Sequence, residues 1–130
     1  MWVALLAAEK GWIANVAVIC SAMSIDLVHV IAEVRLLPTN EGGKTIPLCG
    51  SYRPNHNFFD ASDTVMTVGA IELPEGVKVY PGEAVVAPIA LLWWPGLASQ
   101  IHVGREWRIQ EGAHLVGFGR IIRVLDGEGR

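Results

Sequence analysis

The chain has 130 residues, of which 52% are hydrophobic and 18% are charged, and its formal net charge is −3 at pH 7. This length favours a single domain, and so apolar a composition leaves little room for long disordered segments. The negative net charge argues against a general nucleic-acid-binding protein, which is normally basic.

Residues 1–25 differ from the rest of the chain because they are rich in alanine and valine and carry few charges. Glu9 and Lys10 divide this segment into apolar runs shorter than the roughly 20 residues that cross a bilayer. No basic region precedes an apolar stretch, as a secretory signal requires. We therefore expect no membrane span and a cytoplasmic protein. We expect Met23 to be the natural start and the preceding residues to be an over-extended reading frame; a helix packed on the following domain is the alternative, and the segment is either helical or disordered.

From Asp26 onward the pattern is that of β-strands. Residues 28–36 alternate between apolar side chains on one face and charged side chains such as Glu33 and Arg35 on the other, which is typical of a half-buried strand. Similar patterns predict further strands at residues 45–49, 64–73, 84–93, 106–110 and 115–125.

Turn residues separate these strands. Proline, glycine and asparagine gather at residues 38–43, 74–76, 81–83 and 94–96, and residues 111–113 contain a glycine. Residues 53–57 are predicted to be a loop, because Pro54 cannot donate a ladder hydrogen bond.

Short strands at regular spacing, with no convincing amphipathic helix after Asp26, predict an all-β fold, and closure into an antiparallel β-barrel removes the sheet edges. Gly117 and Gly119 alternate inside the last predicted strand. Glycine inside a strand usually marks close backbone approach or a sharp bend. We expect the barrel to span residues 26–126 and to be followed by a tail at 127–130.

Residues 42–45 read Gly-Gly-Lys-Thr, like the end of a phosphate-binding loop. Pro38 stands where that motif needs its first glycine. Pro47 suppresses the helix whose N-terminus would face the phosphate. We therefore expect no GTP binding.

No other motif indicates catalysis, a metal or a cofactor. The four histidines are far apart in the sequence, and Cys20 and Cys49 lack CxxC spacing. Cys49 is predicted to be a small buried hydrophobic residue. The sequence has no G-x-S-x-G motif and no obvious nucleophile beside a base. We expect a non-enzymatic protein without a metal or other cofactor.

Two surface features remain open. Four arginines fall in the last quarter of the chain: Arg105, Arg108, Arg120 and Arg123. We interpret them as side chains on ordinary solvated strand faces, and a local basic patch is the alternative. Trp93 and Trp94 are adjacent, so at most one of them should enter the core from a strand. The other is a candidate anchor for a protein interface.

Three stretches together resemble the third, C-terminal domain of elongation factor Tu. The first runs from Glu-Gly-Gly-Lys at residues 41–44 to Tyr-Arg-Pro at 52–54. The second is Gly-Ala-Ile-Glu-Leu-Pro-Glu-Gly-Val at 69–77. The third is Ile-Gln-Glu-Gly-Ala at 109–113 with Val-Gly-Phe-Gly at 116–119. Their order and approximate spacing match that domain from residue 30 to residue 125.

The resemblance implies a six-stranded antiparallel Greek-key β-barrel that stands alone, without the GTPase domain of the factor. In the factor this domain touches aminoacyl-tRNA, and the corresponding positions here are Lys44, Thr45, Asn55, Glu111 and Gly112. The resemblance therefore implies a binding module for RNA of the tRNA kind or for a translation-associated protein. A general protein–protein interaction barrel with no role in translation is the alternative.

Overall fold

The computed structural model describes residues 26–61 and 65–125. The expected N-terminal extension, with its start at Met23, and the expected tail lie outside the described residues.

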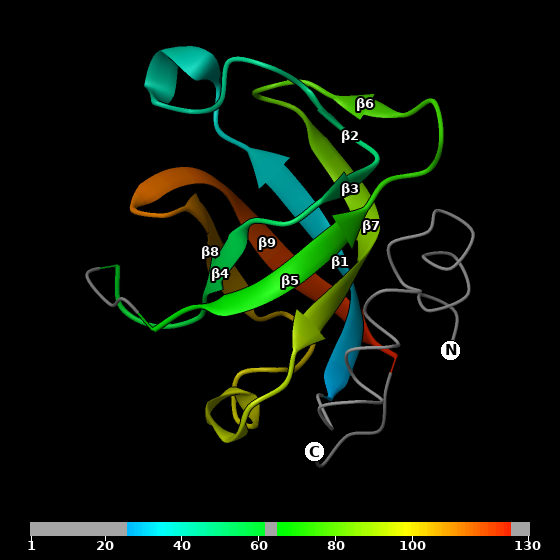
Figure 1. The fold of residues 1–130 in the computed structure, drawn as a ribbon, viewed down its shortest axis with the longest axis vertical. Helices are drawn as coiled ribbons and strands as arrows, with labels where there is room; N and C mark the ends of the chain where they lie inside the picture. Colours follow the sequence, from blue (N-terminus) through cyan, green and yellow to red (C-terminus); the bar gives the residue numbers. More distant parts are fainter. Residues whose placement is uncertain (1–25, 62–64, 126–130) are drawn as a thin grey trace.

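The described residues form a closed β-barrel (Figure 1), which confirms the predicted fold class. The barrel is built from β1 (Leu27–Leu36), β3 (Ser51–Tyr52), β4 (Asn55–Asn57), β5 (Thr67–Glu72), β7 (Ala84–Leu92), β8 (Glu106–Glu111) and β9 (His114–Val124). β1 pairs with β7 and β9, β9 with β8, β8 with β4, and β4 with β5, and the pairing of β5 with β7 closes the ring. Every pairing is antiparallel.

β3 and β4 are two halves of one barrel strand. Tyr52 lies opposite Ile71 of β5 and Asn55 lies opposite Val68, so both halves keep one register along β5. Counted this way, the barrel has six strands. β4, β5 and β7 follow one another around the ring, while β1 lies beside β7, which is a Greek-key arrangement.

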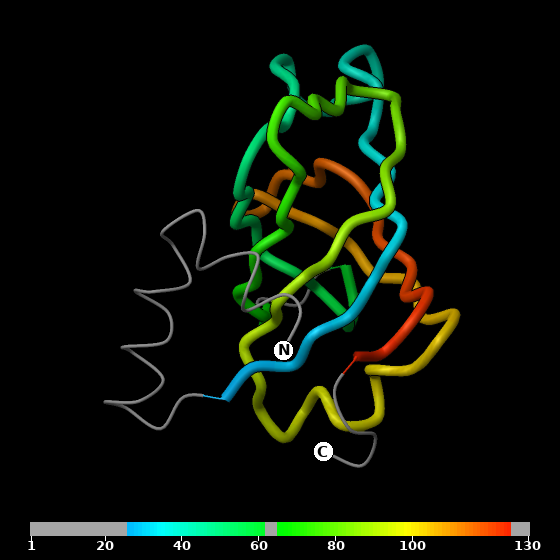
Figure 2. Tube along the Cα trace, turned by 90° about the vertical axis from the view of Figure 1, so that its right-hand side faces the viewer, coloured from blue at the N-terminus to red at the C-terminus, as the bar shows by residue number. Residues whose placement is uncertain are grey.

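The connections gather at the two ends of the barrel. One end carries the turn η1 (Thr39–Glu41) and the small ribbon of β2 (Leu48–Cys49) and β6 (Lys78–Val79), and the other carries the turn η2 (Pro95–Leu97). Figure 2 shows these two groups of loops at opposite ends of the long axis. Within the part of the chain that the structure describes, no helix has the length and apolar character to span a membrane.

The core is formed by the inward positions of the strands. On β1 the predicted apolar face is buried, from Val28 to Leu36 at every second residue. At Gly119 of β9 an added Cβ would lie 2.4 Å from Cζ2 of Trp107, and at Gly117 it would lie 2.3 Å from the carbonyl oxygen of Arg35. The predicted close approach at both glycines is therefore confirmed.

Two local predictions are wrong. The loop predicted at residues 53–57 is mostly β4, which continues the barrel strand of β3. The strand predicted at residues 45–49 is confirmed only at β2, which pairs with β6 in the small ribbon outside the barrel sheet. Pro54 interrupts the ladder locally, and pairing with β5 resumes at Asn55. Cys49 was expected to be buried but is exposed, because Leu48 of the same short strand takes the inward position and neighbours on a strand point to opposite sides.

Candidate functional site

Four of the five predicted RNA-contact residues lie together at the η1 end of the barrel. The segment after η1 carries Lys44, β3 carries Tyr52, and the last residue of β8 is Glu111. The Lys44 Nζ atom lies 2.6 Å from Oε2 of Glu111, and the Tyr52 hydroxyl donates to the same oxygen at 2.5 Å. The Lys44 ammonium also lies 5.3 Å from the centroid of the Tyr52 ring, within the range of a cation–π contact.

The turn between β8 and β9 completes this group. Glu111 lies opposite His114, so Gly112 and Ala113 form a two-residue hairpin turn. Gly112 has a φ of 62°, a left-handed conformation that glycine adopts without steric cost. Its backbone N–H donates to Oδ1 of Asn55 at 3.2 Å. Its carbonyl oxygen accepts a hydrogen bond of 3.0 Å from Nε2 of Gln110.

Charge in this group is already balanced internally. The hydrogen bond from Lys44, and then the one from Tyr52, hold the pKa of Glu111 below its ordinary value. Burial raises the pKa of the Tyr52 phenol, and the hydrogen bond to Glu111 raises it further. Glu111 is therefore a carboxylate at neutral pH, and among the described residues the Lys44 ammonium, whose side chain is 14% exposed, makes its one hydrogen bond to Glu111.

Thr45 is exposed and adjoins Lys44. Within the described residues its side chain makes no hydrogen bond to the other four. We name the five residues the end surface: Lys44, Thr45, Asn55, Glu111 and Gly112.

Removal of the Tyr52 hydroxyl by Tyr52→Phe should destabilise the protein by about 1 kcal/mol, because one charge-assisted hydrogen bond is lost while the ring stays in place. The pKa of Glu111 should also rise towards its ordinary value. Urea unfolding measures the first effect, and an NMR titration of the Glu111 carboxyl measures the second. An unchanged Glu111 pKa would show that the phenol does not stabilise the carboxylate.

The two tryptophans lie at the other end of the barrel. β7 ends at Leu92, so strand alternation does not apply to Trp93 and Trp94, and both are half-buried against the core. The Trp94 Nε1 atom donates to Oγ1 of Thr67 at 2.9 Å, and its ring centroid lies 5.8 Å from that of Phe59. The tryptophans therefore do not form one site with the end surface.

No sequence motif indicates a role for His56, which is fully buried. The indole N–H of Trp107 donates to its Nδ1 at 2.9 Å, and its Nε2 lies 3.3 Å from the carbonyl oxygen of Gly69. Burial lowers the pKa of His56 to about 4. Both ring nitrogens are engaged, so His56 supports the fold and is not available as a base. In residues 26–61 and 65–125, no cluster of three or more His, Cys, Asp or Glu side chains is placed to hold a metal ion.

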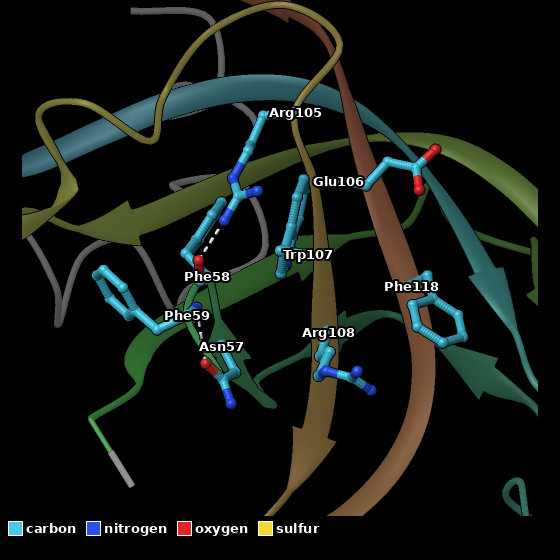
Figure 3. Close-up of a pocket in the computed structure, with 8 residues that line it drawn as sticks. All are labelled: Asn57, Phe58, Phe59, Arg105, Glu106, Trp107, Arg108 and Phe118. Atoms are coloured by element: carbon cyan, nitrogen blue, oxygen red, sulfur yellow. Dashed lines mark hydrogen bonds between the residues drawn. The ribbon is translucent and has the colours of Figure 1, made fainter. Parts of the chain in front are cut away.

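The sequence patterns also did not predict a hollow of about 200 Å³ beside β8 (Figure 3). β4 pairs with β8 only as far as Asn57 opposite Arg108, and the chain then turns away through Phe58 and Phe59. The guanidinium of Arg105 spans the gap and donates to the carbonyl oxygen of Phe58. The remaining lining residues are Glu106, Trp107, Arg108 and Phe118. In the sequence, the only signal for this site is the mixture of arginine and aromatic residues in the last quarter.

No model of a known protein family matches the chain.

Proposed function

We propose that this protein is a non-enzymatic barrel that binds RNA through the end surface. The proposal follows the resemblance to the third domain of elongation factor Tu, in which the corresponding positions meet tRNA. One observation supports it above the others: residues far apart in the sequence meet at one end of the barrel. Lys44 and Tyr52 both donate hydrogen bonds to Glu111, and the backbone N–H of Gly112 donates to Asn55.

The chemistry of the end surface suits a sugar–phosphate backbone. The Lys44 ammonium has three N–H donors, of which Glu111 takes one, and the others fit a phosphate oxygen. The Thr45 hydroxyl and the Asn55 amide add uncharged hydrogen-bonding groups. Because hydrogen bonds already hold the Lys44 and Asn55 side chains, binding costs little ordering of these two side chains. The Glu111 carboxylate repels phosphate, so affinity should be modest and should fall steeply with salt.

A filter-binding titration with tRNA at low and at physiological salt tests this proposal. Lys44→Ala should weaken binding and lower the salt slope by about 1, because one phosphate contact is lost. Glu111→Gln should strengthen binding, because it removes the negative charge while its shape is retained. Lys78→Ala on β6 is the matched control, since Lys78 is exposed outside the end surface, and it should have little effect.

Equal effects of Lys44→Ala and Lys78→Ala would show non-specific attraction and would overturn the assignment to the end surface.

A second candidate function is a protein-interaction barrel without a role in translation. Ile46, next to Thr45, is 62% exposed and favours that function, because an apolar side chain gains nothing from a phosphate backbone. Capture of a translation factor or another protein by this end, with no RNA binding, would support the second candidate.

A further inference from the structure

An aromatic side chain lies between two arginines on the outer face of the barrel. Phe118 of β9 lies directly opposite Arg35 of β1 on one side and opposite Arg108 of β8 on the other. Directly opposite residues of antiparallel strands have Cβ atoms about 5 Å apart. The three side chains therefore form one row across the sheet, which we name the arginine–phenylalanine row.

The row faces away from the core. Gly119 follows Phe118, and a Cβ there would meet the buried Trp107 ring, so Gly119 points inward and Phe118 points outward. Arg35 is exposed, and Phe118 and Arg108 are half-buried. In Figure 3, Arg108 and Phe118 lie on adjoining strands, and the hollow beside β8 reaches both.

Within residues 26–61 and 65–125, no carboxylate forms an ion pair with either arginine of the row. The neighbouring Arg120 lies 3.5 Å from a carboxylate oxygen of Glu33 and also lies opposite Glu106. Neither Arg35 nor Arg108 makes a hydrogen bond or ion pair to any residue of the described ranges. In the part of the chain that the structure describes, the row therefore places one guanidinium group without an ion-pair partner on each side of an aromatic ring.

We propose that the arginine–phenylalanine row binds single-stranded RNA, with a base stacked on Phe118 and the flanking phosphates paired with Arg35 and Arg108. A nucleotide chain carries a phosphate on each side of every base, which matches a ring with a cation on each side. An unpaired base exposes the face that an aromatic side chain on a sheet stacks against, and the planar guanidinium groups pair with phosphate through two hydrogen bonds. An acidic peptide would need an apolar side chain between two acids to match the same row.

This inference takes its ligand class, RNA, from the proposed function but places the contact on a different surface. The end surface, by the resemblance, meets folded tRNA, whereas the row meets an unpaired strand. The two contacts therefore respond to different ligands and different substitutions.

Fluorescence anisotropy with a short labelled RNA that cannot pair with itself tests the inference. Phe118→Leu keeps an apolar side chain but removes the ring, and it should weaken binding about tenfold, since base–aromatic stacking contributes that much. Phe118→Tyr keeps the ring and should stay within about twofold of the parent. Arg35→Ala and Arg108→Ala should each weaken binding and lower the salt slope by about 1.

Tyr80→Leu is the matched control, because Tyr80 is a half-exposed aromatic residue of the turn between β6 and β7, and it should leave the affinity unchanged. Circular dichroism of each variant establishes that the barrel is intact. No binding of the unpaired RNA, or equal effects of Phe118→Leu and Tyr80→Leu, would overturn the inference. Preferential binding of an acidic peptide through Phe118 would replace RNA as the ligand of the row.

The two proposals fail separately. If tRNA binds in a Lys44-dependent way and the unpaired RNA does not bind, only the arginine–phenylalanine row is refuted. If the unpaired RNA binds through Phe118 and Lys44→Ala does not weaken tRNA binding, only the end surface is refuted. If neither RNA binds, both proposals are wrong.

Discussion

Gly117→Ala should destabilise the barrel by about 3 kcal/mol. The new Cβ would lie 2.3 Å from the carbonyl oxygen of Arg35 and 3.2 Å from Cα of Leu36. Both atoms belong to the backbone of β1, which pairs with β9 here and with β7 on its other side. A clash with a doubly paired strand cannot be relieved by a rotamer change, so the cost should reach the upper end of the range for overpacking. The midpoint of urea unfolding, compared at constant m-value, measures the loss.

Gly76→Ala provides the contrast for this experiment. Gly76 has a φ of 83° and no atom within 4 Å of an added Cβ. Alanine at Gly76 therefore bears only the cost of a left-handed backbone, about 1–2 kcal/mol. A Gly117→Ala variant no less stable than Gly76→Ala would show that β1 and β9 do not approach as closely as the structure has them.

The close approach at Gly117 shows which parts of this fold could be predicted from the sequence. The alternation in residues 28–36 predicts the buried face of β1, and a glycine inside a strand predicts a neighbouring backbone or ring. Both signals are local. Pro54 predicts a loop at residues 53–57, but in the structure it only interrupts the strand formed by β3 and β4. What continues the strand is pairing with β5 and β8, and such long-range pairing leaves no local pattern.

The candidate surfaces depend still more on contacts between distant residues. Lys44 and Glu111 are separated by 67 positions, and no motif spacing predicts that their charges meet. The resemblance to the elongation factor selected both residues, but it gave no indication that they neutralise each other. The arginine–phenylalanine row depends on the register of three strands, including the irregular step between Ile109 and Gln110. A sequence pattern could identify its arginines but not the ring between them.

Acid should weaken the fold through His56 by about 3 kcal/mol between pH 6.5 and pH 4. The imidazole is fully buried and neutral, and burial lowers its pKa from 6.5 to about 4. Between these values the unfolded state holds the proton and the folded state does not, so stability falls as the pH falls. Above pH 6.5 the stability that depends on a neutral His56 is fully present, and below pH 4 it is fully lost. Each pH unit in this window is worth about 1.4 kcal/mol.

Urea unfolding at several pH values from 7 to 4 measures this slope, and His56→Gln identifies its origin. The amide of glutamine does not titrate, and it can still accept from Trp107 and donate to the carbonyl oxygen of Gly69. The variant should be less stable at pH 7, because it packs less well, but it should lose much less stability on acidification. Glu111 does not supply the same slope above pH 4.5, because its folded-state pKa lies below the ordinary value of 4.5 and its contribution to stability is lost only between 4.5 and that lower value. Equal slopes for the parent and His56→Gln above pH 4.5 would mean that His56 is not the buried neutral group of this core.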